Sequence, residues 1–263
     1  MSLRINSNVD ALAAHRRLSA TSDAVSKSME RLSSGLRINK AADDAAGLGI
    51  SEKMRGQIRG LAQAQRNIQD GVSMVQTAEG NLDEVHSILQ RVRELAVQYK
   101  NGTLSTSGQN AIQSEVDALT SEIDRIQTAA QFNGVTLLGT AASVTFQVGA
   151  NDSDTISVTF GAASVSTSYD LTSTAILSTI DADIDAVSTT RATFGAVQNR
   201  LDHALAVAGT YQENLTSAES RIRDVDMAEE MVSLTKNQIL QQAGTAMLAQ
   251  ANQAPQAVLQ LLR

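Results

Sequence analysis

Two clusters of carboxylates and arginines lie at breaks between predicted helices, and their residue types are the ones best suited to proton transfer. Their members are Asp43, Asp44, Asp224 and Asp226, with Arg37, Arg221 and Arg223 close by in sequence. Paired carboxylates can act as general acid and base. Charged residues at the starts of helices are more often caps or solvated ion pairs. We therefore interpret both clusters as structural, with Asp43 or Asp44 capping the helix that follows.

The rest of the sequence has no pattern typical of catalysis or metal binding. It contains no Cys, and its three histidines, His15, His86 and His203, are far apart, so a zinc site is not expected. Gly47-Leu48-Gly49 lacks the preceding strand of a phosphate-binding loop, and there is no HExxH motif. We expect a protein that is not an enzyme, with no catalytic residues, no cofactor and no metal.

The charge distribution argues against nucleic-acid and membrane binding. The net charge is −7, and the 65 residues between Arg125 and Arg191 contain no Lys or Arg. The remainder is nearly neutral with mixed signs, which suits the packing of like copies, and it has no basic face paired with aromatic residues. No apolar run reaches the roughly 18 residues of a membrane span. The chain start also lacks the apolar core of a cleavable secretory signal, which is compatible with the cytoplasm or with export that removes no leader.

Large aromatic side chains are confined to the middle of the sequence. Tyr99 is the first of the seven and Tyr211 the last. Aromatic rings usually dominate compact cores, so the two ends must pack aliphatic side chains and alanines instead. Long helices that pack along their lengths suit this composition.

Apolar residues spaced by three, four or seven predict five helices. The first covers about residues 1–38, and three later ones lie near residues 112–130, near 178–222 and from 224 onward, the last bent or weakened by Pro255. The second helix begins after residue 44, runs for about 55 residues or roughly 80 Å, and stops near residues 100–102. It carries an apolar residue every seven positions: Met54, Leu61, Ile68, Val75, Leu82, Leu89 and Ala96.

The second row of this heptad pattern is diluted by polar residues. Ile58 and Val72 belong to it, and it continues with the following residues: Gln65, Glu79, His86 and Arg93. The helix therefore has a sustained apolar seam on one side only. We interpret four glycines in this helix as points of close helix packing, with small register shifts as the alternative: Gly56, Gly60, Gly71 and Gly80.

The middle of the chain predicts a β-hairpin. Apolar residues alternate with polar ones around Phe146 and again around Val158, and a Gly/Asn/Asp loop at 149–154 separates the two runs. Residues 161–175 are rich in Ser and Thr and predict an exposed loop. The expected fold is mainly α: a long antiparallel helical rod or coiled-coil bundle with a small hairpin, and termini paired as a second helical layer.

Seven blocks of the sequence, in order, resemble bacterial flagellin. The blocks are LRINSN with AL at 3–12, SMERLSSGLRINKAADDAAGLGISEKMRGQIRGL at 28–61, QRVRELAVQ at 90–98, FNG at 132–134, AVQNRLDH at 196–203, ENLTSAESRIRDVDMAEEM at 213–231, and MLAQANQAPQAVLQLLR at 247–263. The resemblance covers nearly all of the chain outside about 140–180, so this is a short member with almost no central insertion.

The resemblance implies a structural subunit that polymerises into the flagellar filament, for motility. In flagellins the chain ends pair as an inner helical domain, here residues 1–43 with 224–263. An α-rich rod domain surrounds it, here residues 44–223, with the hairpin at about 143–160. Flagellins are secreted unfolded through the flagellar type III apparatus and act outside the cell. The Ser and Thr of 140–193 are then either glycosylation acceptors, as in some flagellins, or part of a solvated loop.

The resemblance and the apolar seams of the terminal helices together assign expected polymerisation residues. They are Leu3, Ile5, Val9, Leu12, Leu18, Val25, Met29, Leu32, Leu36, Met231, Leu234, Ile239, Met247, Leu248, Leu259, Leu261 and Leu262. A single helix of this composition, without an aromatic anchor, is marginal alone, so we expect residues 1–40 and 225–263 to order only on assembly. The resemblance further implies recognition of the monomer by the innate Toll-like flagellin receptor through Arg91, Leu95 and Glu115.

The expected partners follow from the same resemblance. They are other copies of the chain, alone or mixed with sister flagellins, a flagellar export chaperone, the hook-associated junction and cap proteins, and the host Toll-like receptor. Neither nucleic acid nor a membrane is expected. Two alternatives remain at this stage: the hook–filament junction protein, which shares the terminal pattern, and a soluble helical binding module or adhesin with the rod as spacer.

Overall fold

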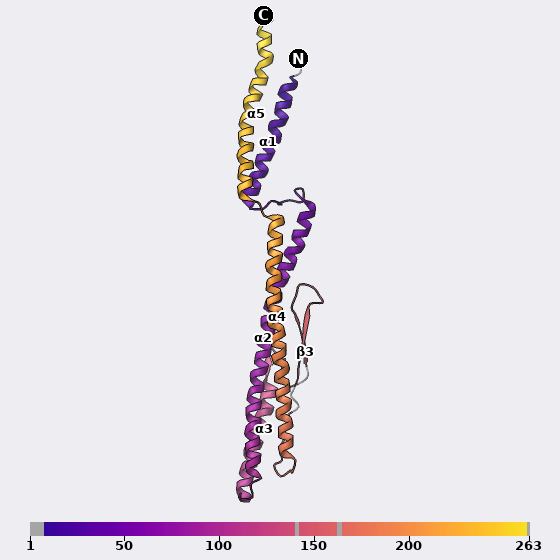
Figure 1. Cartoon of the computed structure of the whole chain (residues 1–263), viewed down its shortest axis with the longest axis vertical. Coiled ribbons are helices and arrows are strands. Elements are labelled where there is room, and N and C mark those ends of the chain that lie inside the picture. The colour runs from indigo at the N-terminus through magenta and orange to yellow at the C-terminus, as the bar shows by residue number, and fades with distance from the viewer. Residues whose placement is uncertain (1–7, 140–141, 162–164, 262–263) are drawn as a thin grey trace. The chain divides into compact units, whose positions relative to one another are not determined.

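A computed structural model describes residues 8–139, 142–161 and 165–261, without the side chains of residue 142 and of residues 254–261. Figure 1 shows the elements. The helices are α1 (Val9–Ser34), α2 (Ala45–Tyr99), α3 (Thr106–Ala129), α4 (Ile176–Arg223) and α5 (Met227–Leu261). The strands are β1 (Gln131–Phe132), β2 (Val135–Thr136), β3 (Ala142–Gln147) and β4 (Thr155–Phe160). The predicted fold class and five helices are confirmed.

The first helix is shorter than the predicted 1–38, because Gly35 ends it. Gly35 has a φ of 71°, the left-handed conformation that favours glycine, and its N–H caps the Arg31 carbonyl. The chain beyond it pairs with the segment after α4: Arg37 N–H donates to the Arg223 carbonyl at 2.7 Å, and Val225 N–H donates to the Gly35 carbonyl at 3.1 Å. α5 accordingly starts at Met227 rather than at 224, and it continues through Pro255.

The chain divides into two compact units. The terminal unit comprises Met1–Gly56 with Leu215–Arg263, and the central unit comprises Gln57–Asn214. The sequence placed the divisions at 43/44 and 223/224 instead. The difference arises because the start of α2 and the end of α4 contact each other: Arg223 Nη1 donates to Glu52 Oε1 at 2.6 Å. One turn or more of each long helix therefore belongs to the terminal unit.

The central unit has a continuous apolar core. The heptad residues of α2 from Leu61 to Ala96 are buried, as are Val187, Phe194, Leu201 and Ala208 of α4 and Ile112, Val116 and Ile123 of α3. Burial of such side chains, at about 25 cal/mol per Å² of apolar area, is the main force that holds long helices together. These apolar residues of the three helices therefore form the core of the central unit.

The polar second row of α2 contacts α4. Gln65 Nε2 donates to Gln212 Oε1 at 2.8 Å, Arg93 Nε donates to Asp181 Oδ1 at 2.6 Å, and Arg191 lies 3.8 Å from Glu79. Residue numbers rise along α2 as they fall along α4 in these pairs. The two helices are therefore antiparallel, and their polar pairs fix the register beside the apolar seam.

The hairpin β3–β4 packs on α2. Phe146 pairs with Ile156 and Val144 with Val158 in its antiparallel register, as the alternation predicts. A Cβ on Gly71 would lie 3.2 Å from the Phe146 ring, and one on Gly60 would lie 3.1 Å from Ala150. Close packing is therefore the role of these two glycines, whereas Gly56 and Gly80 have open space beside them.

Two details of the middle region differ from the prediction. The segment 165–175, expected to be exposed, buries Tyr169 and Leu171. The Tyr169 hydroxyl donates to the buried Asp183 carboxylate at 2.6 Å, and Gln113 bonds to the backbone of both Tyr169 and Leu171. The small pair β1–β2 was not predicted at all; Asn133 and Gly134, with φ of 48° and 80°, form its two-residue turn.

Candidate assembly surface

Helices α1 and α5 of the terminal unit pair along their lengths in antiparallel orientation (Figure 1). Asn8 Nδ2 donates to the Ala251 carbonyl at 2.8 Å at one end. Arg31 Nη1 lies 3.4 Å from Glu230 Oε2 near the other. Between them, Gly244 lies against Leu18. The predicted association of head and tail is therefore present within one chain.

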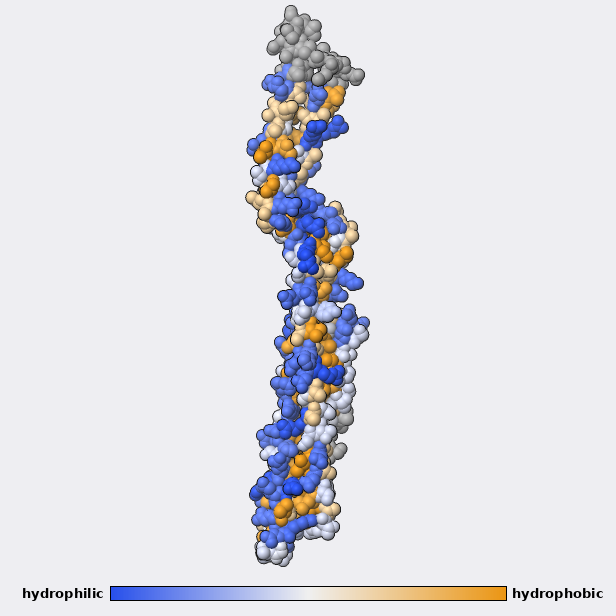
Figure 2. Space-filling model, in the orientation of Figure 1, coloured by the Kyte–Doolittle hydropathy of each residue, from blue (hydrophilic) through white to orange (hydrophobic). Residues whose placement is uncertain are grey.

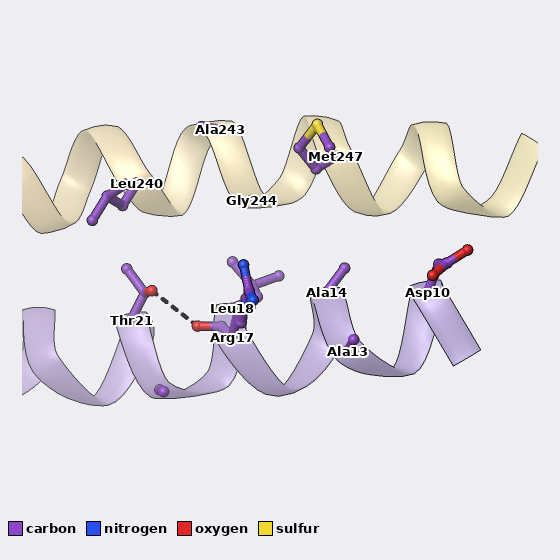
Figure 3. A pocket seen from close by; sticks show the side chains of 11 residues that line it. Asp10, Ala13, Ala14, Arg17, Leu18, Thr21, Leu240, Ala243, Gly244 and Met247 are labelled. Carbon is purple, nitrogen blue, oxygen red and sulfur yellow. Dashed lines mark hydrogen bonds between the residues drawn. The ribbon is translucent and has the colours of Figure 1, made fainter. Parts of the chain in front are cut away.

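A largely apolar groove of about 640 Å³ runs between the two helices. Figure 3 shows Leu18 and Ala14 of α1 pointing toward α5, where Leu240, Gly244 and Met247 form the opposite wall. The walls carry small residues, so the helices do not fill the space between them with their own side chains. The groove leaves apolar surface that a further helix can cover.

The terminal unit has almost no core of its own. Among the described residues, 31 hydrophobic side chains are buried, and only Ile38 and Leu234 of these belong to the terminal unit. Neither α1 nor α5 buries a stripe comparable to the seam of α2. Since helices in water depend on tertiary burial for most of their stability, the α1–α5 pair is the weaker part of the subunit.

Exposed apolar side chains are concentrated on the same unit. Ten of the 14 large hydrophobic residues that are exposed in the described chain belong to it: Val9, Leu12, Met29, Ile50, Met227, Met231, Val232, Ile239, Leu240 and Met247. Figure 2 shows hydrophobic residues at the surface over α1 and α5. The concentration of exposed apolar side chains on this unit favours an interaction site there.

The predicted polymerisation residues divide by burial. Six are exposed: Val9, Leu12, Met29, Met231, Ile239 and Met247. Five are half-buried: Leu18, Val25, Leu32, Leu36 and Leu248. Leu234 is buried within the subunit, which is at odds with its assignment to a contact surface. Leu3, Ile5 and Leu262 lie outside the described residues, as do the side chains of Leu259 and Leu261.

Four exposed residues were missed by the sequence reasoning: Ile50, Met227, Val232 and Leu240. A selection of about one apolar residue per helical turn identifies only one apolar stripe along a helix. Val232 and Leu240 directly follow Met231 and Ile239, so the apolar surface of α5 covers more than one stripe. The signal that could have found them is the high apolar content all round this helix.

The three residues assigned to receptor recognition do not share one surface. Arg91 of α2 and Glu115 of α3 are exposed and lie together, with Arg91 Nη2 donating to Glu115 Oε1 at 3.0 Å. Glu115 and then Glu94 raise the pKa of Arg91. Leu95 is 1 % exposed, so its assignment as a contact residue is corrected. Its burial follows from α2 packing against both α3 and α4, which requires a wider apolar face than a heptad seam.

The acidic clusters take part in helix capping and ion pairing. Asp44 Oδ1 accepts the Gly47 N–H at 2.8 Å at the start of α2, and Asp226 Oδ1 accepts the Ala228 N–H at 2.9 Å at the start of α5. Asp43 contacts Lys27 at 2.8 Å. This ion pair, with the Lys40 N–H, lowers the pKa of Asp43 to about 2. Their geometry matches the structural interpretation of both clusters.

The described residues contain neither a metal-binding cluster nor a membrane-spanning helix. No group of three or more His, Cys, Asp or Glu residues there could hold a metal ion. Within the same residues, no helix has the length and apolarity that a membrane span needs.

Comparison with known proteins identifies the family. The bacterial flagellin N-terminal helical region matches residues 5–143, and the bacterial flagellin C-terminal helical region matches residues 177–262. A flagellin of Halalkalibacterium halodurans is 53% identical over 98% of this chain and 99% of its own length. A flagellin of Bacillus subtilis is 50% identical over 99% and 100%. The flagellar filament 33 kDa core protein of Treponema phagedenis is 48% identical over 98% and 99%.

Solved structures agree with these relatives. The crystal structure of Bacillus cereus flagellin has a TM-score of 0.50 and 32% identity over 54% of this chain and 88% of that one. A putative flagellar hook-associated protein from Vibrio parahaemolyticus, at a TM-score of 0.57 and 15% identity over 69% of this chain and 100% of that one, shares the fold. With both terminal regions matched and relatives at half identity over nearly the full length, the chain belongs to the bacterial flagellin family.

Proposed function

We propose that the terminal unit supplies the surface through which copies of this flagellin join into a filament. The chain is a structural subunit of the bacterial flagellar filament. The observation that carries the proposal is the contrast between its units. Among the described residues, the terminal unit buries two hydrophobic side chains and exposes ten large ones, whereas the central unit buries 29. Neighbouring copies provide the apolar cover that the α1–α5 pair lacks.

This arrangement gives a physical role to each part. The terminal unit forms the inner layer of the filament, where each copy covers the α1–α5 groove and the exposed apolar side chains of other copies. An interface that joins different patches of identical subunits generates an open helix when its rotation does not close. The central unit, with its own core, stays folded without help from neighbouring copies. The assembled chain is extracellular, and its partners are other copies or sister flagellins, an export chaperone, and the junction and cap proteins.

The same comparisons favour a filament subunit over the hook–filament junction protein. The relatives from Halalkalibacterium halodurans, Bacillus subtilis and Treponema phagedenis, all at least 48% identical, are named flagellin or flagellar filament core protein. The hook-associated neighbour shares 15% identity. A soluble binding module would not elongate filaments, so seeded elongation distinguishes that alternative from a filament subunit.

The test is seeded elongation with a double substitution on α5. Val232 and Ile239 are 70% and 60% exposed, so Val232→Gln with Ile239→Gln leaves the subunit's own core intact. We expect the critical concentration for growth from filament fragments to rise by about tenfold or more, as when central apolar contacts of an interface are removed. Sedimentation of the polymer measures it.

The matched control is Val207→Gln, a change of similar chemistry at a side chain that is 57% exposed on the central unit. It should shift the critical concentration far less than the α5 pair does. Normal elongation of the α5 double variant would overturn the proposal. So would failure of the unmodified chain to elongate from any seed.

A second candidate function is recognition of the monomer by the innate Toll-like flagellin receptor. The supporting observation is the exposed Arg91–Glu115 pair, which joins α2 and α3 and offers a guanidinium and a carboxylate side by side. Arginine in such a position forms bidentate bonds to a partner and often contributes strongly to binding. Leu95 would act only indirectly, by supporting Arg91 from the core.

Reporter cells that respond to the receptor provide the test. Arg91→Ala and Glu115→Ala should each reduce the response to purified monomer by about tenfold or more. Arg93→Ala is the matched control, because Arg93 forms a similarly exposed ion pair with Asp181 two residues along the same helix. No response to the unmodified monomer, or equal losses in all three variants, would reject this function.

A further inference from the structure

The methionines of this chain are unevenly placed. Among those that the structure describes, four are half exposed or more, and all four lie on α1 and α5: Met29, Met227, Met231 and Met247. Met74, in the core of the central unit, is 4% exposed. Thioethers usually fill gaps in cores, so their presence on the surface of the terminal unit needs an explanation.

These side chains lie on the proposed assembly surface. Met247 forms part of the wall of the α1–α5 groove, beside Gly244 and opposite Ala14 (Figure 3). The ion pair between Arg31 and Glu230 brings the stretch of α1 that carries Met29 alongside the stretch of α5 that carries Met231. The thioethers are therefore spread over both ends of the helix pair and not gathered at one point.

An exposed thioether reacts with peroxides. The sulfur attacks one peroxide oxygen, the O–O bond breaks, an S=O bond forms, and water leaves after proton transfer. Each sulfur loses two electrons, which the peroxide takes up. The product is a methionine sulfoxide, a polar and chiral group that disrupts Met-rich interfaces and that sulfoxide reductases convert back to the thioether.

We propose that these four methionines are peroxide-oxidation sites that reversibly prevent the free subunit from joining a filament. The inference rests on the assembly role proposed for the terminal unit. A sulfoxide oxygen pressed against apolar side chains of a neighbouring copy has no hydrogen-bond partner there, which makes its burial costly. In an assembled filament the same sulfurs are covered, so oxidation acts on subunits before assembly and spares those already incorporated.

The experiment treats purified monomer with hydrogen peroxide and measures elongation from untreated filament fragments. We expect the critical concentration to rise by about tenfold or more, and treatment with methionine sulfoxide reductases to restore it. Mass spectrometry of proteolytic fragments should find oxygen on Met29, Met227, Met231 and Met247, and little on Met74. Peroxide-treated filaments should show protection of the first four sites.

The matched variant replaces all four residues by leucine, a change that conserves volume and hydrophobicity. Peroxide should leave the critical concentration of this variant for elongation from seeds unchanged, whatever that value is before treatment. A Met74→Leu variant should remain as peroxide-sensitive as the unmodified chain. If the four-leucine variant fails to assemble without peroxide, recovery of oxidised unmodified chain by the reductases decides the question alone.

Two results would overturn the inference. One is normal elongation of unmodified monomer in which mass spectrometry shows the four sulfurs oxidised. The other is a peroxide-induced loss of elongation that the reductases do not reverse, or that peroxide also causes in the four-leucine variant. Failure of untreated chain to elongate would instead count against the assembly proposal itself, so the two failures are distinguishable.

Discussion

Individual side chains in this flagellin hold together segments that have no regular structure. In the connection between α1 and α2, Asp43 accepts the N–H groups of Asn39 and Lys40 and pairs with Lys27 of α1. In the segment before α4, Asp183 accepts the Tyr169 hydroxyl and the Ser166 N–H. In both places a single carboxylate accepts two hydrogen bonds from a segment that lies outside the helices and strands, and so fixes its position.

The first prediction concerns the titration of Asp43. Lys27, followed by the Lys40 N–H, lowers its pKa from 3.8 to about 2. Because the folded pKa is the lower one, the stabilising contribution is complete above pH 3.8 and is lost as the pH falls through about 2. Lys27→Ala should move the NMR-detected midpoint of Asp43 upward toward 3.8. Lys40→Ala, whose side chain pairs with Glu30 and whose backbone N–H remains, should leave it nearly unchanged.

The second prediction concerns the Tyr169 hydroxyl. Burial and then the bond to Asp183 raise the pKa of Tyr169 far above its usual range, so the hydroxyl stays a donor. Tyr169→Phe leaves the buried carboxylate one donor short, and we expect it to lower the unfolding free energy of the central unit by about 1.5–3 kcal/mol in urea titrations. Tyr211→Phe, at a ring 63% exposed, is the control and should change little. Equal stability of both variants would contradict the role given to Asp183.

These residues also show where sequence reasoning stops. The heptad positions of α2 from Leu61 to Ala96 are buried as predicted, and so are the apolar residues of β4, whereas Val144 and Phe146 of β3 are half-buried. These positions could be predicted because each apolar stripe is periodic and faces another periodic stripe. Tyr169 was missed because its burial depends on Gln113 and Asp183, which are distant in sequence and belong to other helices. Leu95 was assigned to a contact surface because a family motif identifies a sequence position but does not show whether neighbouring helices bury its side chain.

At the scale of elements, α2 makes three kinds of contact. Its apolar seam packs in the core, its polar row bonds to α4, and its glycines at 60 and 71 receive the hairpin. A long helix with this many glycines loses intrinsic helix stability, at about 0.8–1.0 kcal/mol for each glycine relative to alanine. The loss is offset only where the missing side chain permits a contact.

The third prediction compares two glycines of α2. Gly71→Val places methyl groups against the Phe146 ring, which already lies 3.2 Å from a Cβ at that position. We expect it to destabilise the central unit by about 1–3 kcal/mol, as overpacking does. Gly80 has no neighbouring atom within 4 Å of such a Cβ, so Gly80→Val should stay within about 0.5 kcal/mol of the unmodified chain. Thermal unfolding of both variants measures the difference, and similar losses at both sites would refute the packing role of Gly71.

At the scale of the whole molecule, burial is divided unequally between two units. The central unit is a complete domain with a core of its own, and the terminal unit is a helix pair whose apolar residues mostly face outward. Under the assembly proposal, neighbouring copies supply the apolar burial that the terminal unit lacks alone. The helical pattern of the termini, and their dependence on assembly, could be expected from the sequence and the family resemblance. How few apolar residues the α1–α5 pair itself buries could not be predicted, because the same seams would fit an internal bundle equally well.

Amide hydrogen exchange of the free subunit and of assembled filaments tests this account most directly. It predicts fast exchange across α1 and residues 227–253 of α5 in the free subunit, strong protection of the same amides in the filament, and nearly equal protection of the α2, α3 and α4 core in both states. Slow exchange of α1 and α5 in the free subunit would contradict it, as would filaments in which those amides remain unprotected.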